Sequence, residues 1–174
     1  INGKLYGWPF LLDVIGTGWH SGIVKKAGLP DEAPATWGEY LARSQQVVDS
    51  GAAQFGATFD AHGWRSLAPF THSLSSDAYT SEGLFDFTGD AAIEALVLMK
   101  NIMRDSHPDI LLAGATDGGV NGTPDEVAFA AQRVGYYNKY FNAPLRMAQY
   151  WDNPKDLNMG PLPKFAGGEG STVF

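Results

Sequence analysis

The stretch Thr36–Asp60, TWGEYLARSQQVVDSGAAQFGATFD, predicts a capped helix followed directly by a strand. Thr36 and Glu39 have the spacing of a capping box, in which each side chain accepts a hydrogen bond from the backbone N–H of the other residue. Apolar residues then recur at helical spacing until Gly51 ends the helix. The run that follows, AAQFGATF, predicts a short strand that ends at Asp60. A helix and a strand in direct succession indicate an α/β fold.

Helices and strands alternate in a similar way on both sides of this stretch. On the N-terminal side, the sequence predicts a short strand over Gly3–Phe10 and a short helix over Ile23–Leu29. On the C-terminal side, it predicts helices at 65–76, 90–106, 126–132 and 143–151, and strands at 133–140 and 157–163. This order of elements favours α/β layers around one core.

The longest predicted helix, Asp90–Ser106, is apolar over much of its surface. We expect it to be well buried, with one apolar row formed by Ala92, Leu96, Met99 and Met103. Pro108 ends the helix, and residues 114–122, GATDGGVNG, are predicted to form a flexible loop. A second capping box, Thr123 with Glu126, starts the next helix.

Composition narrows the classes of function. The chain has 174 residues, a formal net charge of −7 and no cysteine. Its twelve Lys and Arg residues are dispersed, whereas a protein that binds nucleic acid needs them clustered. No stretch approaches the roughly 20 apolar residues of a membrane-spanning helix. The unusual feature is an aromatic content of 13%, with five Trp residues.

Sequence motifs for catalysis or cofactor binding are absent. There is no P-loop, no GxGxxG after a strand, no HExxH and no GxSxG. We therefore expect no cofactor, and the four dispersed His residues give no reason to expect a metal site. Two of Asp13, Asp60 and Asp86 could form the carboxylate pair of a glycoside hydrolase. The sequence gives no spacing for such a pair, so this hydrolase is the alternative hypothesis.

Several segments occur in an order that resembles a known family. GKLYGWPF at 3–10 is followed by KKAGLPDEAPATWGEYL at 25–41, and much later come YYN at 136–138, YWDNP at 150–154 and MGPLPKFAGGEGSTVF at 159–174. This order resembles the extracellular solute-binding proteins of bacterial ABC importers, in the sugar-binding group that includes maltose-binding-like proteins. One segment departs from that pattern, because Trp19-His20-Ser21-Gly22 stands where the family usually has Tyr-Asn-Lys.

The resemblance implies a fold and a function for the chain. Such proteins have two α/β lobes of the type II periplasmic-binding-protein fold, joined by hinge strands, with the ligand in the cleft between them. Residues 1–174 look like the second lobe, a mixed sheet flanked by helices, with 1–10 and 157–174 as hinge strands and the first lobe missing. The implied function is capture of a sugar or oligosaccharide for a membrane permease, without catalysis.

The resemblance also implies a location in the periplasm or outside the cell. Contact with the membrane would run only through the permease or a lipid anchor. A third hypothesis, beside receptor and hydrolase, is an interaction domain whose exposed face docks on a permease.

Five candidate ligand residues come from two loops. A sugar receptor needs aromatic rings for the C–H face of the sugar and polar side chains for its hydroxyls. Asp60, His62 and Trp64 share the loop after the strand that ends at Asp60. Trp8 and Asp13 follow the predicted hinge strand, where the resemblance places cleft residues.

Five further candidates lie on other segments. Tyr137, Asn138 and Tyr140 lie where the strand at 133–140 turns toward a helix, whose amides favour polar ligand groups. Trp19 and His20 lie in the segment that departs from the family pattern, and their alternative is a core Trp beside a hydrogen-bonded His. Two other tryptophans, Trp37 and Trp151, are expected to be structural.

Overall fold

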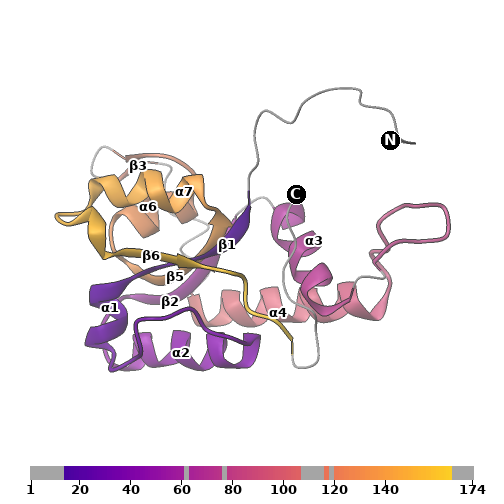
Figure 1. Ribbon diagram of the computed structural model, residues 1–174, viewed down its shortest axis with the longest axis horizontal. Coiled ribbons are helices and arrows are strands. Elements are labelled where there is room, and N and C mark those ends of the chain that lie inside the picture. Colours follow the sequence, from indigo (N-terminus) through magenta and orange to yellow (C-terminus); the bar gives the residue numbers. More distant parts are fainter. Residues whose placement is uncertain (1–13, 61–62, 76–77, 107–115, 118–119, 166–174) are drawn as a thin grey trace.

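The computed structural model describes residues 14–60, 63–75, 78–106, 116–117 and 120–165. Four strands form one sheet in the order β2-β5-β1-β6 (Figure 1). These are β1 (Ile15–His20), β2 (Phe55–Phe59), β5 (Val134–Tyr140) and β6 (Leu157–Gly160). β5 pairs parallel with β2 and antiparallel with β1, which pairs antiparallel with β6. The predicted mixed sheet is therefore confirmed.

Helices cover both faces of this sheet. In Figure 1, α2 (Trp37–Asp49) and α4 (Asp90–Ser106) lie below it, and α6 (Pro124–Ala130) and α7 (Asn142–Met147) lie above it. The remaining elements are α1 (Ser21–Lys26), α3 (Gly63–Leu74), the short strands β3 (Thr116–Asp117) and β4 (Val120–Asn121), and the 3-10 helices η1 (Ala148–Tyr150) and η2 (Pro154–Asp156). This arrangement is an α/β fold with helices on both sides of a mixed sheet, as predicted.

Each face of the sheet has its own apolar core, and β5 contributes to both. Tyr136 joins the cluster formed with α2, α3 and α4, whereas Tyr137 joins the cluster formed with α6 and α7. Successive side chains of a strand point to opposite faces, so Tyr136 and Tyr137 must lie on opposite faces of the sheet. Trp37 belongs to the first cluster and Trp151 to the second, which confirms that both are structural.

Two predicted capping boxes begin helices. Thr36 Oγ1 accepts a hydrogen bond from Glu39 N at 3.2 Å. The Glu39 carboxylate reaches back to Ala35 N at 2.7 Å, one residue earlier than predicted. Before α6, Thr123 N donates to Glu126 Oε2 at 3.0 Å, and the reciprocal bond is also present. Both helix starts are therefore set by local side-chain chemistry.

The close contact between α2 and β2 requires a glycine. A Cβ atom built on Gly56 would lie 2.2 Å from the backbone oxygen of Ser44 in α2. No real Cβ atom approaches a backbone oxygen so closely, so only glycine lets the helix pack at this depth.

The structure differs from the predictions in three segments. The strand β1 occupies Ile15–His20, where no strand was predicted, and it forms the centre of the sheet with β5. Residues 116–117 and 120–121 pair as the small antiparallel sheet of β3 and β4, so the segment predicted to be a loop contains two short strands. The predicted helix over 143–151 is α7 followed by the 3-10 turn η1.

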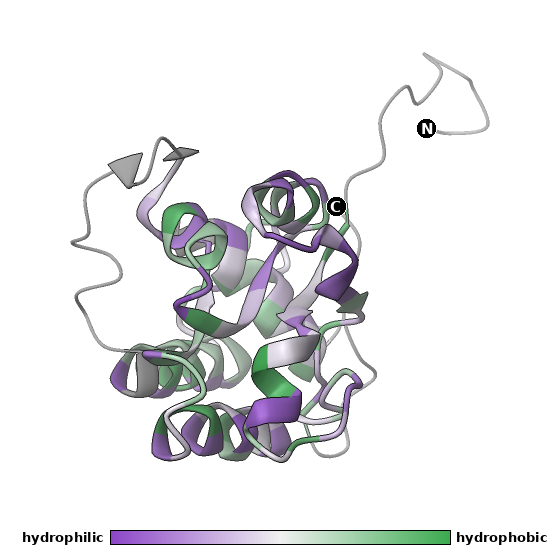
Figure 2. Cartoon of the chain, turned by 90° about the vertical axis from the view of Figure 1, so that its left-hand side faces the viewer, coloured by the Kyte–Doolittle hydropathy of each residue, from purple (hydrophilic) through white to green (hydrophobic). Residues whose placement is uncertain are grey.

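The prediction that Asp90–Ser106 is well buried was wrong. The buried row of α4 consists of Ala92, Ala95, Leu98 and Ile102, and Leu96 from the predicted row is about half exposed. Ile93 and Val97 are exposed to a similar degree. In Figure 2 the helices at the bottom of the view carry hydrophobic as well as hydrophilic stretches. The helix is apolar on two sides, and only one of them faces the core.

Candidate ligand-binding edge

The parallel strands β2 and β5 end at the same edge of the sheet, and the candidate site lies there. Asp60 directly follows β2, and its N–H donates to the carbonyl oxygen of Asn138 in β5 at 3.1 Å. Tyr140 ends β5, and α3 begins at Gly63. Open α/β sheets bind ligands outside the carboxyl ends of their parallel strands, where helices begin. We call the residues around this edge, Asp60, Arg65, Lys139 and Tyr140, the β2–β5 edge.

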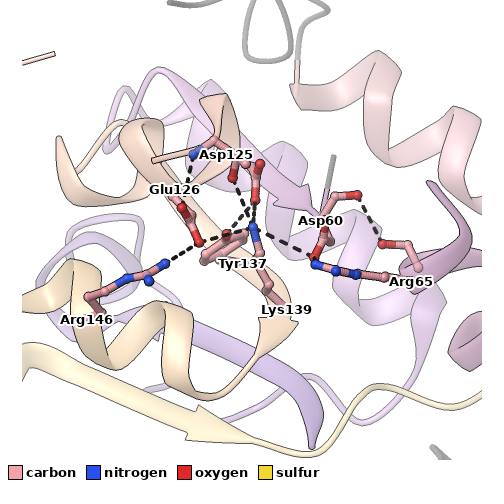
Figure 3. Close-up of polar contacts among 9 residues, drawn as sticks. Asp60, Arg65, Asp125, Glu126, Tyr137, Lys139 and Arg146 are labelled. Carbon is pink, nitrogen blue, oxygen red and sulfur yellow. Dashed lines mark hydrogen bonds and ion pairs between the residues drawn. The ribbon is translucent and has the colours of Figure 1, made fainter. Parts of the chain in front are cut away.

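A buried lysine connects the β2–β5 edge to α6. Figure 3 shows the Lys139 ammonium between Asp125 and Asp60. The Lys139 side chain is only 6% exposed. Its Nζ atom lies 2.8 Å from Asp125 Oδ2, 3.0 Å from Thr123 Oγ1, 3.3 Å from Glu126 Oε1 and 3.8 Å from Asp60 Oδ2. A buried charge is tolerated only when it is paired and hydrogen-bonded, and these contacts meet that requirement.

Two arginines complete the charge balance of this network. Arg146 Nη2 lies 2.6 Å from Glu126 Oε1, and Arg65 Nη1 lies 3.8 Å from Asp60 Oδ2. The network thus combines three carboxylates with three cations. Arg65 also lies over the Tyr140 ring, with its Cζ atom 5.8 Å from the ring centroid. This contact places a guanidinium and an aromatic ring together at the edge.

The Tyr137 hydroxyl adds a hydrogen bond to this network. It donates to Asp125 Oδ2 at 2.5 Å. Burial raises the pKa of the Tyr137 hydroxyl well above its usual value, and the negative charge of Asp125 raises it further. The hydroxyl therefore stays protonated and acts as a donor.

Four of the predicted site residues meet at this edge: Asp60, Tyr137, Asn138 and Tyr140. Asn138 is buried on the opposite face of β5 from Tyr137, and its Oδ1 accepts from Thr17 Oγ1 at 2.9 Å. Asp60 and Tyr137 are also buried, whereas Tyr140 is partly exposed. Tyr140 is therefore the member of this group best placed to contact a ligand directly.

The structure places Trp19 and His20 away from this edge. Trp19 pairs with Tyr136, four residues before Tyr140, which corresponds to roughly 13 Å along the strand. Its indole Nε1 donates to Asp31 Oδ1 at 2.9 Å. His20 caps α1, because its Nδ1 accepts from Gly22 N at 3.0 Å and Ile23 N at 3.4 Å. These contacts match the alternative, a core Trp beside a hydrogen-bonded His.

The cap made by His20 should make the stability of the chain depend on pH. Burial lowers the pKa of His20, against an opposing charge from Asp156. The folded chain therefore disfavours the protonated ring, which also cannot accept the two amide hydrogen bonds through Nδ1. The free energy of unfolding should be unaffected by His20 above its ordinary pKa of 6.5 and should fall as the pH drops below it.

Urea unfolding between about pH 8 and pH 5 measures this effect, with His20→Asn as the matched variant. Asn also caps helices well but does not titrate. The difference between the two stability curves should grow as the pH falls through 6.5. Parallel curves would show that His20 is not the titrating group.

Other predicted residues lie outside the described part of the chain. Trp8, Asp13 and His62 belong to this group. The backbone of Trp64 lies in the first turn of α3, but its side chain is not described. Asp86, from the hydrolase hypothesis, accepts hydrogen bonds from Thr88 and Gly89 just before α4. In that position Asp86 helps to start a helix.

Sequence reasoning missed the charged residues of the network: Arg65, Asp125, Glu126, Lys139 and Arg146. One signal was available for Lys139. It alternates with Tyr137 on a strand whose side chains point to a covered face, and a lysine at such a position needs an acidic partner. Which acid provides the charge depends on the position of α6, and the sequence does not give that position.

Comparisons with known proteins support the architecture. No protein-family model matches the sequence. A search of curated proteins also finds no match. Among solved structures, maltose-bound MalE3 of T. maritima matches 99% of this chain with a TM-score of 0.76 and 16% identity. A solute-binding protein of an ABC transporter from Agrobacterium vitis, with bound D-mannitol, matches 99% with a TM-score of 0.75 and 16% identity.

A third solved structure is the extracellular solute-binding protein family 1 from Alicyclobacillus acidocaldarius, which matches 100% of this chain with a TM-score of 0.74 and 17% identity. The chain has the fold of one lobe of a solute-binding protein. The matches cover only 44%, 42% and 42% of those three chains, so this chain spans less than half their length. Among its described residues, no helix is long and apolar enough to cross a membrane.

Proposed function

We propose that this chain is the ligand-binding lobe of the solute-binding component of an ABC importer, and that its ligand is a neutral sugar or polyol. The observation that carries the proposal is the fold match over 99% of the chain to proteins with bound maltose and bound D-mannitol. In this proposal residues 1–10 and 157–174 are hinge strands, and a further lobe of the same protein closes the cleft. A membrane permease receives the ligand outside the cytoplasm.

The proposed ligand contacts are on the β2–β5 edge. Tyr140 offers an aromatic face to the C–H side of a sugar, and Arg65 offers N–H donors to its hydroxyls. Asp60 supplies carboxylate oxygens at the same edge. His62 and Trp64 follow Asp60 in sequence and are proposed as further contacts, as are Trp8 and Asp13.

The charge balance of the network favours a neutral ligand over an anion. Each cation near the edge already faces a carboxylate: Lys139 faces Asp125, Arg146 faces Glu126 and Arg65 faces Asp60. A sugar acid or a phosphate would have to compete with these carboxylates for its cation. The proposed function needs no catalysis, and no contact among the described residues specifically favours the hydrolase.

Titration with maltose and D-mannitol, followed by amide NMR spectra of the chain, tests the proposal. We expect weak binding, with a dissociation constant in the millimolar range, because one lobe provides only part of the contacts. Backbone amides of Asp60, Arg65 and Tyr140 should shift with the ligand. Tyr140→Ala should reduce these shifts at least several-fold at about 10 mM ligand.

Tyr150→Ala is the matched control, because Tyr150 is an exposed tyrosine in η1 and is not one of the residues of the β2–β5 edge. It should leave the titration unchanged. If only amides on another surface shifted, the ligand would bind there and not at the β2–β5 edge. If neither ligand shifted any amide at up to about 50 mM, the carbohydrate assignment would fail.

A further inference from the structure

The exposed apolar side chains of this chain are concentrated in one region. Of the eight large apolar residues that are exposed in the described part of the chain, six lie between residues 79 and 97. Three of these are on α4: Ile93, Leu96 and Val97, each about half exposed. Their spacing of three and four residues places them on one side of the helix. We call these three residues the α4 ridge.

A hollow lies beside the α4 ridge. It has a volume of about 200 Å³, and α2 and α4 line it together. Its apolar lining residues are Trp37, Leu41, Val97, Leu98 and Phe165. A ridge of side chains next to a groove is the surface that packs against another helix. Contiguous exposed apolar surface of this kind marks an interaction site more often than a free surface.

Charges at the two ends of α4 indicate the orientation of a partner helix. The exposed residue Asp90 opens the helix, and the exposed residues Lys100 and Arg104 lie near its end. Asp90 and Arg104 are each seven residues from Val97. Seven residues are almost two full helical turns, so all three residues lie along nearly the same line of the helix.

We propose that the α4 ridge binds the α4 ridge of a second copy of this chain, in antiparallel orientation around a two-fold axis at Val97. In this arrangement Val97 contacts its counterpart, and Ile93 of each copy lies opposite Asn101 of the other copy, beside the aliphatic part of its Lys100. Asp90 then lies opposite Arg104 of the other copy, and the same pair occurs twice by symmetry. The negative start of each helix also faces the positive residues at the end of the other.

The size of the surface predicts a weak dimer. Stable interfaces bury about 800 Å² on each partner, and the face of a single helix is smaller than that. We therefore expect a dissociation constant on the order of 10⁻⁴ M. The proposal does not depend on the identity of the ligand or on the β2–β5 edge.

Sedimentation velocity of the 174-residue chain, from about 10 µM to 1 mM, tests the proposal. The chain should change from monomer to dimer across this range. Val97→Glu should weaken the dimer by at least about 30-fold, because it brings two carboxylates together in an apolar contact. Leu145→Glu is the control, because Leu145 is equally exposed but lies on α7, above the sheet.

Exchange of the end charges tests the antiparallel arrangement. Asp90→Arg and Arg104→Asp should each weaken the dimer by about five-fold, and the double variant should restore it to within about two-fold. A melting curve of each variant separates this effect from a loss of helix stability. A chain that stays monomeric at 1 mM, or a dimer that Val97→Glu leaves intact, would overturn the proposal, as would a double variant weaker than both single variants.

Discussion

Lys139→Met should lower the free energy of unfolding by about 3–5 kcal/mol, the largest electrostatic effect that we expect in this chain. Lys139 is the buried cation that faces Asp125, Glu126 and Asp60. Methionine has a similar length and keeps the apolar packing of the stem. Its side chain leaves Asp125 and Glu126 buried without the ammonium, and an uncompensated buried charge is far more costly than a lost surface ion pair.

Urea unfolding followed by circular dichroism measures this effect, with two companion variants. Arg146→Ala removes a cation of the same network whose side chain is 59% exposed, and it should cost less than about 1 kcal/mol. Adding Asp125→Asn to Lys139→Met should recover part of the loss, because it removes the charge that Lys139 neutralises. This double variant also keeps the test measurable if Lys139→Met does not fold.

A loss below about 1 kcal/mol for Lys139→Met would contradict the network as described. It would mean that Asp125 and Glu126 do not need the ammonium. The same result would mean that the position of Asp60 at the β2–β5 edge does not depend on its contact with Lys139. Ligand binding at that edge could be intact in either case, so the proposed function does not depend on this result.

Local features of the fold were predictable from sequence because their causes are local. Both capping boxes involve residues three apart, Thr36 with Glu39 and Thr123 with Glu126, and both begin helices in the structure. The strand ending at Asp60 and the strand carrying Tyr137 were also predicted. Both strands were predicted to end at polar residues, and the structure places Asp60 directly after β2 and Tyr140 at the end of β5.

Features that depend on distant contacts were not predictable. The central strand β1 reads IGTGWH, and its glycines argue against a strand. The Phe141 side chain, which precedes α7, explains one of them, since a Cβ atom on Gly16 would lie 2.1 Å from its ring. In α4 the pattern gave two apolar sides, and it could not show which side faces the sheet. The structure buries Ala95 and exposes Leu96.

The charged part of the candidate site shows the same limit. Lys139 meets Asp125 and Glu126 only because α6 lies over the face of β5 that carries odd-numbered side chains. Asp60 joins them because β2 pairs parallel with β5. Neither the position of α6 nor the pairing of the strands follows from the spacing of the residues. A sequence can therefore indicate which strand ends carry polar groups, but not which charges they meet.

Trp37→Ala should lower the free energy of unfolding by about 3–5 kcal/mol, the largest effect that we expect from the apolar core. Trp37 is 2% exposed at the start of α2. Its ring packs edge-on against Phe70 of α3 at 4.7 Å and against Tyr40 at 5.3 Å, and its Nε1 donates to Ser73 Oγ at 3.0 Å. Truncation removes these contacts and leaves a cavity between α2 and α3 that the neighbouring helices cannot fill completely.

Urea unfolding followed by circular dichroism tests this prediction against two matched variants. Trp37→Phe keeps an aromatic ring but loses the bond to Ser73, and it should cost about 1–2 kcal/mol. Tyr150→Ala removes an exposed aromatic ring and should cost less than about 0.5 kcal/mol. If Trp37→Ala lowered the free energy of unfolding no more than Tyr150→Ala does, the contacts of Trp37 with α3 would not stabilise the fold. Other residues of the apolar cluster of α2, α3 and α4 would then have to hold these helices together.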